Sequence, residues 1–359
     1  MKSYNTTNVR NVVLLGSTKA GKTTLVESML YEGKVIDRRG AVENKNTVSD
    51  NTEIEQIYQR SIYSTLLYTE FMDNKLNFID TPGSDDFVGG VISAFSVCEA
   101  GVMLVNATQG VEVGTDIFAR YAKQYNKPLI FAVNQLDSEK QDWHATIDSM
   151  RAMLGKRMVL IQMPVNPGTG FDTFIDVLTN KCYHFKDENG TREEMPIPEE
   201  LADEVAQMRQ NMMEVAAEGT EELMEIFFEK GELTIDQMRA GLSAGIAAGT
   251  AYPVFCLSAK RDIGVKRLME FIINVVPAPS KKEAKLKNGG TVKFDASAPT
   301  SLFVFKTAQE QHLGDVTYFK VITGTLKEGD DLINPETGNK ERISAIYAVA
   351  GKKREKVSE

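Results

Sequence analysis

The sequence predicts an α/β domain, with a mostly parallel sheet covered by helices on both faces, followed by an all-β domain. Two patterns along the chain indicate this division. From residue 11 to about 275, short apolar runs alternate with longer amphipathic stretches, as in parallel strands joined by crossover helices. From residue 300 onward, short apolar runs are separated by tight turns, which favours antiparallel β-structure.

Six apolar runs supply the strands expected in the parallel sheet, and each is followed by a Gly, Pro, Asp or Asn signal. They are residues 11–15, 75–79, 101–107, 128–134, 158–164 and 253–258. Between about 165 and 250, a charged loop and acidic helical segments interrupt the alternation, which predicts an α/β insertion before the last core strand. Five apolar residues of this insertion fall at helical spacing and predict a buried stripe, namely Leu201, Val205, Met208, Met212 and Val215.

The pattern also predicts domain boundaries. Residues 1–280 are expected to form the first domain, 281–299 a polar linker, and 300–359 the start of a β-barrel. The strands expected in the barrel region are 302–306, 316–323, 331–333 and 342–347. Because these strands are few for a closed barrel, the sequence is expected to stop inside this domain.

Composition excludes several classes of protein. The chain has 359 residues, of which 42% are hydrophobic and 25% charged, so collagen-like, low-complexity and wholly disordered classes are out. No apolar run approaches the ~20 residues that span a bilayer, and no secretory core is visible at the start. Three widely spaced cysteines inside apolar runs predict buried thiols of a reducing compartment. A cytoplasmic protein without a membrane partner is expected.

The net charge and the histidines exclude further classes of partner and ligand. The formal net charge of −9 argues against a whole-surface nucleic-acid binder, and no DNA partner is expected. The three histidines have no cysteine or carboxylate at ligand spacing, so a zinc site is not expected.

A glycine-rich loop follows the first expected strand and precedes a predicted helix. It has the spacing G-x-x-x-x-G-K-[ST], in which the glycines let successive backbone N–H groups point at phosphate oxygens. Lys22 is expected to neutralise the β- and γ-phosphates of a nucleotide, and Thr23 to ligate Mg²⁺. The predicted phosphate-binding residues of this loop are Gly16, Ser17, Thr18, Lys19, Ala20, Gly21, Lys22, Thr23 and Thr24.

A second phosphate segment ends another expected strand, at Asp80-Thr-Pro-Gly83. Asp80 is expected to hold a water molecule bound to Mg²⁺, and the N–H of Gly83 to contact the γ-phosphate. The predicted metal site therefore uses Thr23 directly and Asp80 through water.

Two further strand ends indicate which base is bound. In Asn134-Gln-Leu-Asp137, the Asp137 carboxylate can accept hydrogen bonds from the ring N–H and exocyclic amine of guanine, a donor pair that adenine lacks. In Ser258-Ala-Lys, a backbone N–H can meet the guanine carbonyl oxygen. The predicted guanine-binding residues are Asn134, Gln135, Asp137, Ser258, Ala259 and Lys260. The expected ligands are GTP or GDP with Mg²⁺.

Longer segments resemble the N-terminal half of bacterial elongation factor G, and the likeness covers essentially the whole chain. The matching segments are Asp80-Thr-Pro-Gly-Ser-Asp-Asp-Phe87, Thr108-Gln-Gly-Val-Glu112, the acidic insert at 198–224 and Phe319-Lys-Val-Ile-Thr-Gly-Thr-Leu-Lys-Glu-Gly-Asp330. The resemblance implies a monomeric GTPase that acts in translocation on the ribosome, where it contacts ribosomal RNA and ribosomal proteins.

Two departures from the family pattern concern the γ-phosphate. Where the family has a His that positions the attacking water, this chain has Ser84, whose hydroxyl is too short to reach the same place and carries no positive charge. Where the first switch of the family has a Thr that ligates Mg²⁺, the aligned residue is Tyr63. Ser64 or Thr65 could replace that Thr only if the register slips.

Two more departures lie in the binding loops. Lys19 stands where the family has an Asp that helps to hold a monovalent cation, so its ammonium would replace that ion or else be a solvated loop lysine. Gln135 replaces a Lys whose apolar stem covers the base, which predicts a lower affinity with unchanged specificity.

Because the chain keeps the phosphate and guanine segments, GTP and GDP are expected to bind. Because of the departures, Ser84 is expected to be a defective catalytic residue and hydrolysis to be weak or absent. Two alternatives stay open. The first is a conventional GTP-hydrolysing translocase, in which Asp85 or a rearranged loop takes over from the missing His. The second is a ribosome protection protein of the tetracycline-resistance type.

Overall fold

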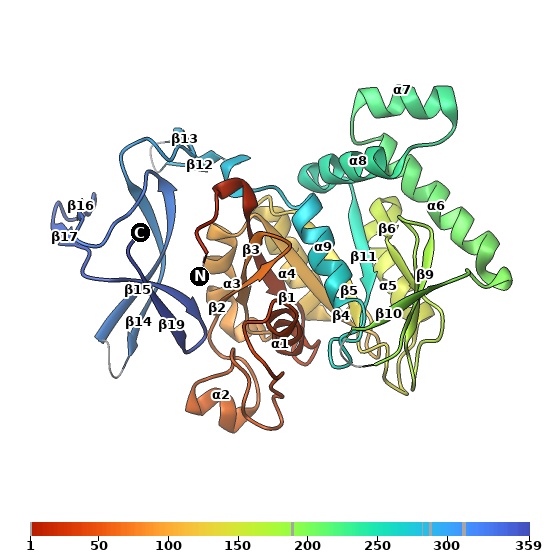
Figure 1. Cartoon of the computed structure of the whole chain (residues 1–359), viewed down its shortest axis with the longest axis horizontal. Coiled ribbons are helices and arrows are strands. Elements are labelled where there is room, and N and C mark those ends of the chain that lie inside the picture. Colours follow the sequence, from red (N-terminus) through yellow and green to blue (C-terminus); the bar gives the residue numbers. More distant parts are fainter. Residues whose placement is uncertain (1, 188–189, 282, 287–288, 311–313) are drawn as a thin grey trace.

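The computed structural model describes all residues except 1, 188–189, 282, 287–288 and 311–313. Its centre is a seven-stranded sheet with the strand order β2-β3-β1-β4-β5-β11-β6 (Figure 1). Every pair in this sheet is parallel except β2 with β3. The strands are β1 (Val9–Leu15), β2 (Thr65–Phe71), β3 (Asn74–Asp80), β4 (Ala100–Asn106), β5 (Leu129–Asn134), β6 (Met158–Leu160) and β11 (Tyr252–Cys256).

Helices cover both faces of the sheet, so the predicted α/β class is confirmed. They are α1 (Lys22–Glu32), α3 (Val88–Val97), α4 (Val113–Gln124), α5 (Trp143–Leu154) and α9 (Val265–Val275). Alternation along β1 sends Val12 and Leu14 to the layer of α1 and α9, and Val13 and Leu15 to the layer of α3, α4 and α5. All four side chains are fully buried.

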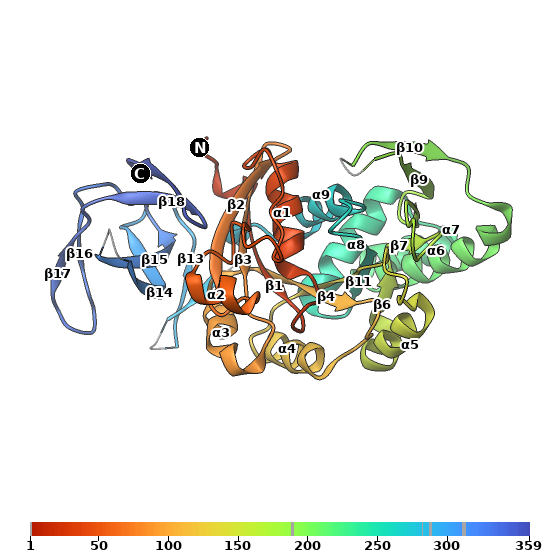
Figure 2. The same cartoon turned by 90° about the horizontal axis from the view of Figure 1, so that it is seen from below.

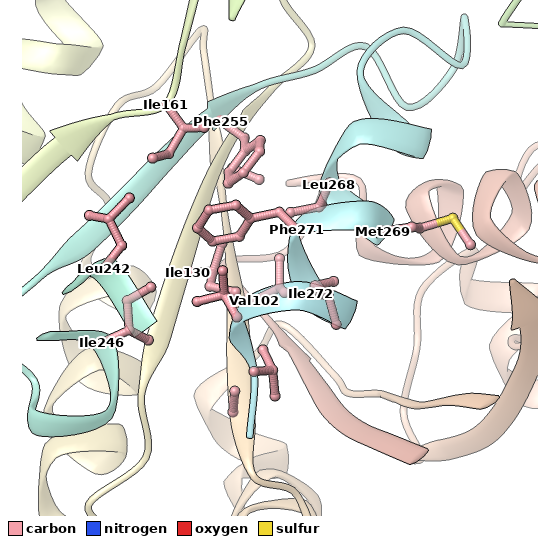
Figure 3. Packing of buried hydrophobic residues seen from close by; sticks show 14 of the residues in the cluster. Val102, Ile130, Ile161, Leu242, Ile246, Phe255, Leu268, Met269, Phe271 and Ile272 are labelled. Atoms are coloured by element: carbon pink, nitrogen blue, oxygen red, sulfur yellow. The ribbon is translucent and has the colours of Figure 1, made fainter. Parts of the chain in front are cut away.

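The α9 layer shows how tightly the sheet is covered. Phe271 of α9 lies among Phe255, Ile130 and Val102 of the strands (Figure 3). The rings of Phe255 and Phe271 are 4.9 Å apart between centroids and meet edge to face, an arrangement that stabilises aromatic pairs.

The predicted insertion forms its own small sheet and three helices. The sheet has the antiparallel order β10-β9-β8-β7, with β7 (Gln162–Pro164), β8 (Thr173–Asp176), β9 (Lys181–Phe185) and β10 (Arg192–Met195). The helices are α6 (Ala202–Ala217), α7 (Glu221–Lys230) and α8 (Ile235–Ala248). Val205, Met212 and Val215 of the predicted stripe are buried, while Leu201 and Met208 are half-buried.

One strand prediction in this region is wrong. The run 158–164 is not one strand, because the chain leaves the central sheet after β6 and enters the insertion sheet as β7. Ile161 lies between the two strands and is fully buried, so the apolar run continues through the break.

Residues after α9 form paired strands, and no closed barrel is present among the residues described. The pairs are β12 (Glu283–Lys285) with β13 (Thr291–Lys293), β14 (Ser301–Glu310) with β15 (Gly314–Thr323), β16 (Asp331–Ile333) with β17 (Lys340–Arg342), and β18 (Ile346–Ala350) with β19 (Lys353–Val357). The first pair lies in the segment expected to be a linker, and the run 342–347 is divided between β17 and β18. The β14–β15 region lies beside the β2 edge, and the insertion lies at the opposite side of the sheet (Figures 1 and 2).

Short elements complete the fold. They are α2 (Glu53–Tyr58) and the 3-10 turns η1 (Thr6–Asn8), η2 (Asp85–Phe87), η3 (Gly155–Arg157), η4 (Glu199–Leu201) and η5 (Pro279–Lys281). Within the described part of the chain, no helix is both long and apolar enough to cross a membrane.

Candidate nucleotide-binding site

The predicted phosphate and base segments meet at one edge of the central sheet. The glycine-rich loop follows β1, the segment from Asp80 ends β3, Asn134 ends β5, and Ser258 follows β11. Ligands of open parallel sheets bind at the carboxyl ends of the strands, and this edge is that end. The fold therefore brings together the four segments that sequence reasoning selected.

Two glycines of the phosphate loop cannot be replaced without a clash. Gly16 has a φ of +136°, and a Cβ there would lie 2.4 Å from the Leu104 carbonyl oxygen. Gly21 has a φ of +93°, and a Cβ there would lie 2.3 Å from the Asn134 Nδ2 atom. Gly21 also precedes α1 as its N-cap residue, which directs the positive end of the helix dipole at the loop.

Lys22 lies inside this loop. Its Nζ donates to the carbonyl oxygens of Gly16, at 2.8 Å, and of Ser17, at 3.0 Å. Burial lowers the pKa of Lys22 to about 8, while the carboxylates of Asp80 and Asp50 oppose that shift. A phosphate group bound in this loop would place a negative charge directly beside the buried ammonium.

The predicted metal residues are in contact. Thr23 Oγ1 donates to Asp80 Oδ2 at 2.9 Å, and Ser49 Oγ donates to the same oxygen at 2.6 Å. Asp80 is fully buried, its Oδ1 has no hydrogen-bond partner within the described structure, and burial raises its pKa. An unpaired buried carboxylate oxygen beside hydroxyl groups fits a hard divalent cation such as Mg²⁺.

Three residues of this metal region were missed by sequence reasoning: Ser49, Asp50 and Ser61. Ser61 Oγ lies 3.2 Å from Thr23 Oγ1, whereas no hydrogen bond joins Thr23 to Tyr63, Ser64 or Thr65 within the described residues. Asp50 also has a buried Oδ1 with no hydrogen-bond partner among the described residues, and burial together with the Asp80 charge raises its pKa to about 7. A cation would stabilise both carboxylates in their charged forms.

Asn134 joins the phosphate loop to both base segments. Its Nδ2 donates to the Ala20 carbonyl oxygen, and its Oδ1 accepts from the Ala259 N–H, each at 2.9 Å. The Ala259 N–H is thus already bonded, and the Ser258 N–H donates to the Ile263 carbonyl oxygen. Of the three N–H groups in this segment, only the one at Lys260 has no hydrogen-bond partner among the described residues.

The remaining base residues lie beside this junction. Asp137 is half-buried, so its carboxylate is accessible to a ligand, as its predicted role as the acceptor for guanine requires. Gln135 adopts a left-handed φ of +65°, and its Nε2 donates to the Lys19 carbonyl oxygen at 2.7 Å. Gln135 therefore ties the base segment to the phosphate loop with an uncharged amide.

The departures at the γ-phosphate have distinct positions. Ser84 Oγ donates to Asp86 Oδ2 at 3.1 Å, and Tyr63 is 52% exposed. The side chain of Lys19 is exposed, and its ammonium forms no hydrogen bond or ion pair with the described residues. Gly83 lies against the phosphate loop, where an added Cβ would lie 2.6 Å from the Thr18 backbone nitrogen.

Comparison with known families agrees with this assembly of loops. Residues 7–278 match the family described as elongation factor Tu GTP binding domain, and residues 299–359 match elongation factor G domain 2. The chain belongs to the elongation-factor GTPase family. The match to a GTP-binding domain covers most of the chain, and the predicted likeness to the N-terminal half of elongation factor G is confirmed.

Individual relatives of this elongation-factor GTPase match nearly the whole chain. It is 30% identical over 363 residues to elongation factor G of Granulibacter bethesdensis, covering 98% of this chain and 52% of that protein. A crystal structure from Thermus thermophilus matches with a TM-score of 0.87 and 29% identity, over 98% of this chain and 51% of that one. The chain thus spans about half the length of these two relatives.

Proposed function

We propose that this chain is the nucleotide-binding half of an elongation factor G-like protein that binds GTP and GDP and acts on the ribosome in translocation. We also propose that it hydrolyses GTP weakly or not at all. The proposal rests on a contrast within the site. The phosphate and guanine segments are joined by Asn134, while the position after Gly83 holds Ser84, bonded to Asp86.

Nucleotide binding follows from the charges and the unpaired groups at the strand ends. Lys22 and the N-terminus of α1 would bind the phosphates, and Asp137 with the Lys260 N–H would bind guanine. Thr23, Asp80 and Asp50 would hold Mg²⁺, which when bound supplies positive charge to the phosphate oxygens.

Weak hydrolysis follows from the group that is absent beside the γ-phosphate. A serine hydroxyl is a poor general base and cannot carry a positive charge near neutral pH. Losing a positioned proton-transfer group typically costs ~10²–10⁴ in rate, which corresponds to about 3–5 kcal/mol of barrier. The hydroxyl of Ser84 also donates to Asp86, a carboxylate whose charge would repel a phosphate placed beside it.

The proposal extends to the arrangement and surroundings of the protein. Residues 1–280 would be the GTP-binding domain with its insertion, 281–299 the connection, and 300–359 the start of the translation-factor barrel. The protein would work as a cytoplasmic monomer that contacts ribosomal RNA and ribosomal proteins.

A nucleotide titration tests the guanine site. Fluorescently labelled GDP is expected to bind at least ~100-fold more tightly than labelled ADP, because adenine leaves the Asp137 carboxylate unpaired. Asp137→Ala is expected to remove most of that preference, whereas Glu139→Ala, an exposed carboxylate two residues on, is the matched control. Equal affinity of the wild type for GDP and ADP would contradict the base assignment.

Co-sedimentation with purified ribosomes tests the partner. The full-length protein is expected to pellet with ribosomes in the presence of a non-hydrolysable GTP analogue, and Lys22→Ala is expected to abolish that dependence. A protein that stays in the supernatant under all nucleotide conditions would contradict the ribosomal role.

A further inference from the structure

The segment at residues 40–64, which holds the first-switch residues, is folded by two buried carboxylates of the chain itself. One is Glu27 on α1 and the other is Glu55 on α2, and each is only 1% exposed. Both carboxylates accept hydrogen bonds from backbone N–H groups of this segment. Such bonds to charged acceptors are stronger than bonds between neutral groups.

Glu27 fixes the first part of the segment. Its Oε2 accepts from the Gly40 N–H at 2.8 Å, and its Oε1 accepts from the Val48 N–H at 2.6 Å. Burial raises the pKa of Glu27, while these two hydrogen bonds oppose that shift because they favour the charged form. Val48 is followed directly by Ser49 and Asp50, so the contact with Glu27 places these two residues beside Asp80.

Glu55 fixes the second part. Its Oε2 accepts from the N–H of Thr52 at 3.2 Å and from the Thr52 hydroxyl at 2.7 Å. The first of these bonds, together with the Glu55 N–H that donates to Thr52 Oγ1, forms the capping box of α2. Its Oε1 accepts from the N–H of Ile62 at 3.1 Å and from that of Tyr63 at 3.0 Å. One side chain thus closes a loop of about a dozen residues and brings Ser61 to Thr23.

The second domain holds the same segment from outside. Lys306 Nζ of β14 donates to the Ser64 carbonyl oxygen at 2.5 Å. The Gly351 N–H donates to the Leu66 carbonyl oxygen at 3.1 Å, and β18 lies beside the edge strand β2 (Figure 2). A Cβ at Gly351 would lie 2.3 Å from the Val48 carbonyl oxygen, so the two backbones are in close contact.

We propose that Glu27 and Glu55 are positioning residues that keep residues 40–64 folded over the metal side of the site whether or not a γ-phosphate is bound. The family resemblance assigns that task to a Thr bound through Mg²⁺, but the aligned residue Tyr63 contributes its N–H to Glu55 and leaves its ring half exposed. The proposal rests on the proposed function only where it compares GTP with GDP.

Hydrogen–deuterium exchange of the backbone tests the proposal. With GDP or with a non-hydrolysable GTP analogue at saturation, exchange at Gly40, Val48, Ile62 and Tyr63 is expected to agree within about twofold. Glu55→Ala is expected to speed exchange at Ile62 and Tyr63 by about tenfold or more and to leave Gly40 unchanged. Glu27→Ala is expected to show the reverse pattern.

Two variants separate positioning from general loss of structure. Glu55→Gln keeps one carbonyl oxygen as an acceptor, so its exchange at Ile62 and Tyr63 is expected to lie between the wild type and Glu55→Ala. Glu53→Ala removes an exposed carboxylate from the same helix and is expected to change nothing.

Either of two results would overturn the proposal. One is protection of these amides by more than about tenfold when the γ-phosphate analogue replaces GDP in the wild type. The other is unchanged exchange at Ile62 and Tyr63 in Glu55→Ala. The variants are also compared without nucleotide, so a failure of guanine binding, measured separately by fluorescence titration, is distinguishable from a failure of this proposal.

Discussion

Removing the Asn134 side chain is expected to damage folding and nucleotide binding together. Asn134 is 2% exposed and bridges two backbone groups, the Ala20 carbonyl oxygen and the Ala259 N–H, each at 2.9 Å. Leaving one buried polar group unpaired costs about 1–3 kcal/mol, and Asn134→Ala leaves two, so it is expected to lower the free energy of unfolding by roughly 2–6 kcal/mol. Because both bridged loops bind the nucleotide, the affinity for GDP is expected to fall at least about tenfold, or about 1.4 kcal/mol.

Urea denaturation without nucleotide and titration with labelled GDP give the two quantities. Asn134→Asp keeps the acceptor for Ala259 but loses the donor to Ala20, so its loss of stability is expected to be comparable. Asn211→Ala, on the exposed face of α6, is the matched control and should stay within about 0.5 kcal/mol of the wild type. If Asn134→Ala also stayed within that range with unchanged GDP affinity, the bridging role would be refuted.

Three further changes follow from the site. Lys22→Ala is expected to abolish GDP and GTP binding, measured by fluorescence titration, because the main positive partner of the phosphates is lost; retained binding would contradict this. The folded-state pKa of Asp50 is raised from 3.8 to about 7, so its contribution to stability is present below about pH 4 and lost as the pH rises through 7. Between pH 4 and pH 8, the free energy of unfolding measured with urea in EDTA is therefore expected to fall by roughly 2–4 kcal/mol less in Asp50→Asn than in the wild type. An equal fall in both proteins would contradict the raised pKa of Asp50. If the Lys19 ammonium replaces a bound monovalent cation, GDP affinity is expected to be the same in potassium and lithium and to become potassium-dependent in Lys19→Asp; a potassium response of the wild type would refute this.

The sequence predicts the residues at the strand ends well, because parallel strands deliver their carboxyl ends to one edge of the sheet. That Asp80, Asn134 and Ser258 lie close together can therefore be predicted from the order of strands and loops alone. Ser49, Asp50 and Ser61 could not be predicted in this way. Hydrogen bonds to Glu27 and Glu55 help to place them at the site, and such bonds leave no periodic pattern in the sequence.

The errors in the fold have similar causes. A continuous apolar run cannot show that the chain passes from one sheet to another at Ile161, because both sheets bury their strands there. Strand β2 was missed because it is an edge strand with only Leu67 and Thr69 buried, which is a weak alternating signal.

Single-turnover phosphate release from GTP on ribosomes tests the central claim most directly. The full-length protein, saturated with GTP and mixed with excess ribosomes, is expected to bind the nucleotide but to release phosphate at least about 100-fold more slowly than an elongation factor G that has the catalytic His. Ser84→His alone is expected to restore this rate only in part, because Tyr63 still replaces the switch Thr. Phosphate release by the wild type as fast as that of the His-containing factor would contradict the account.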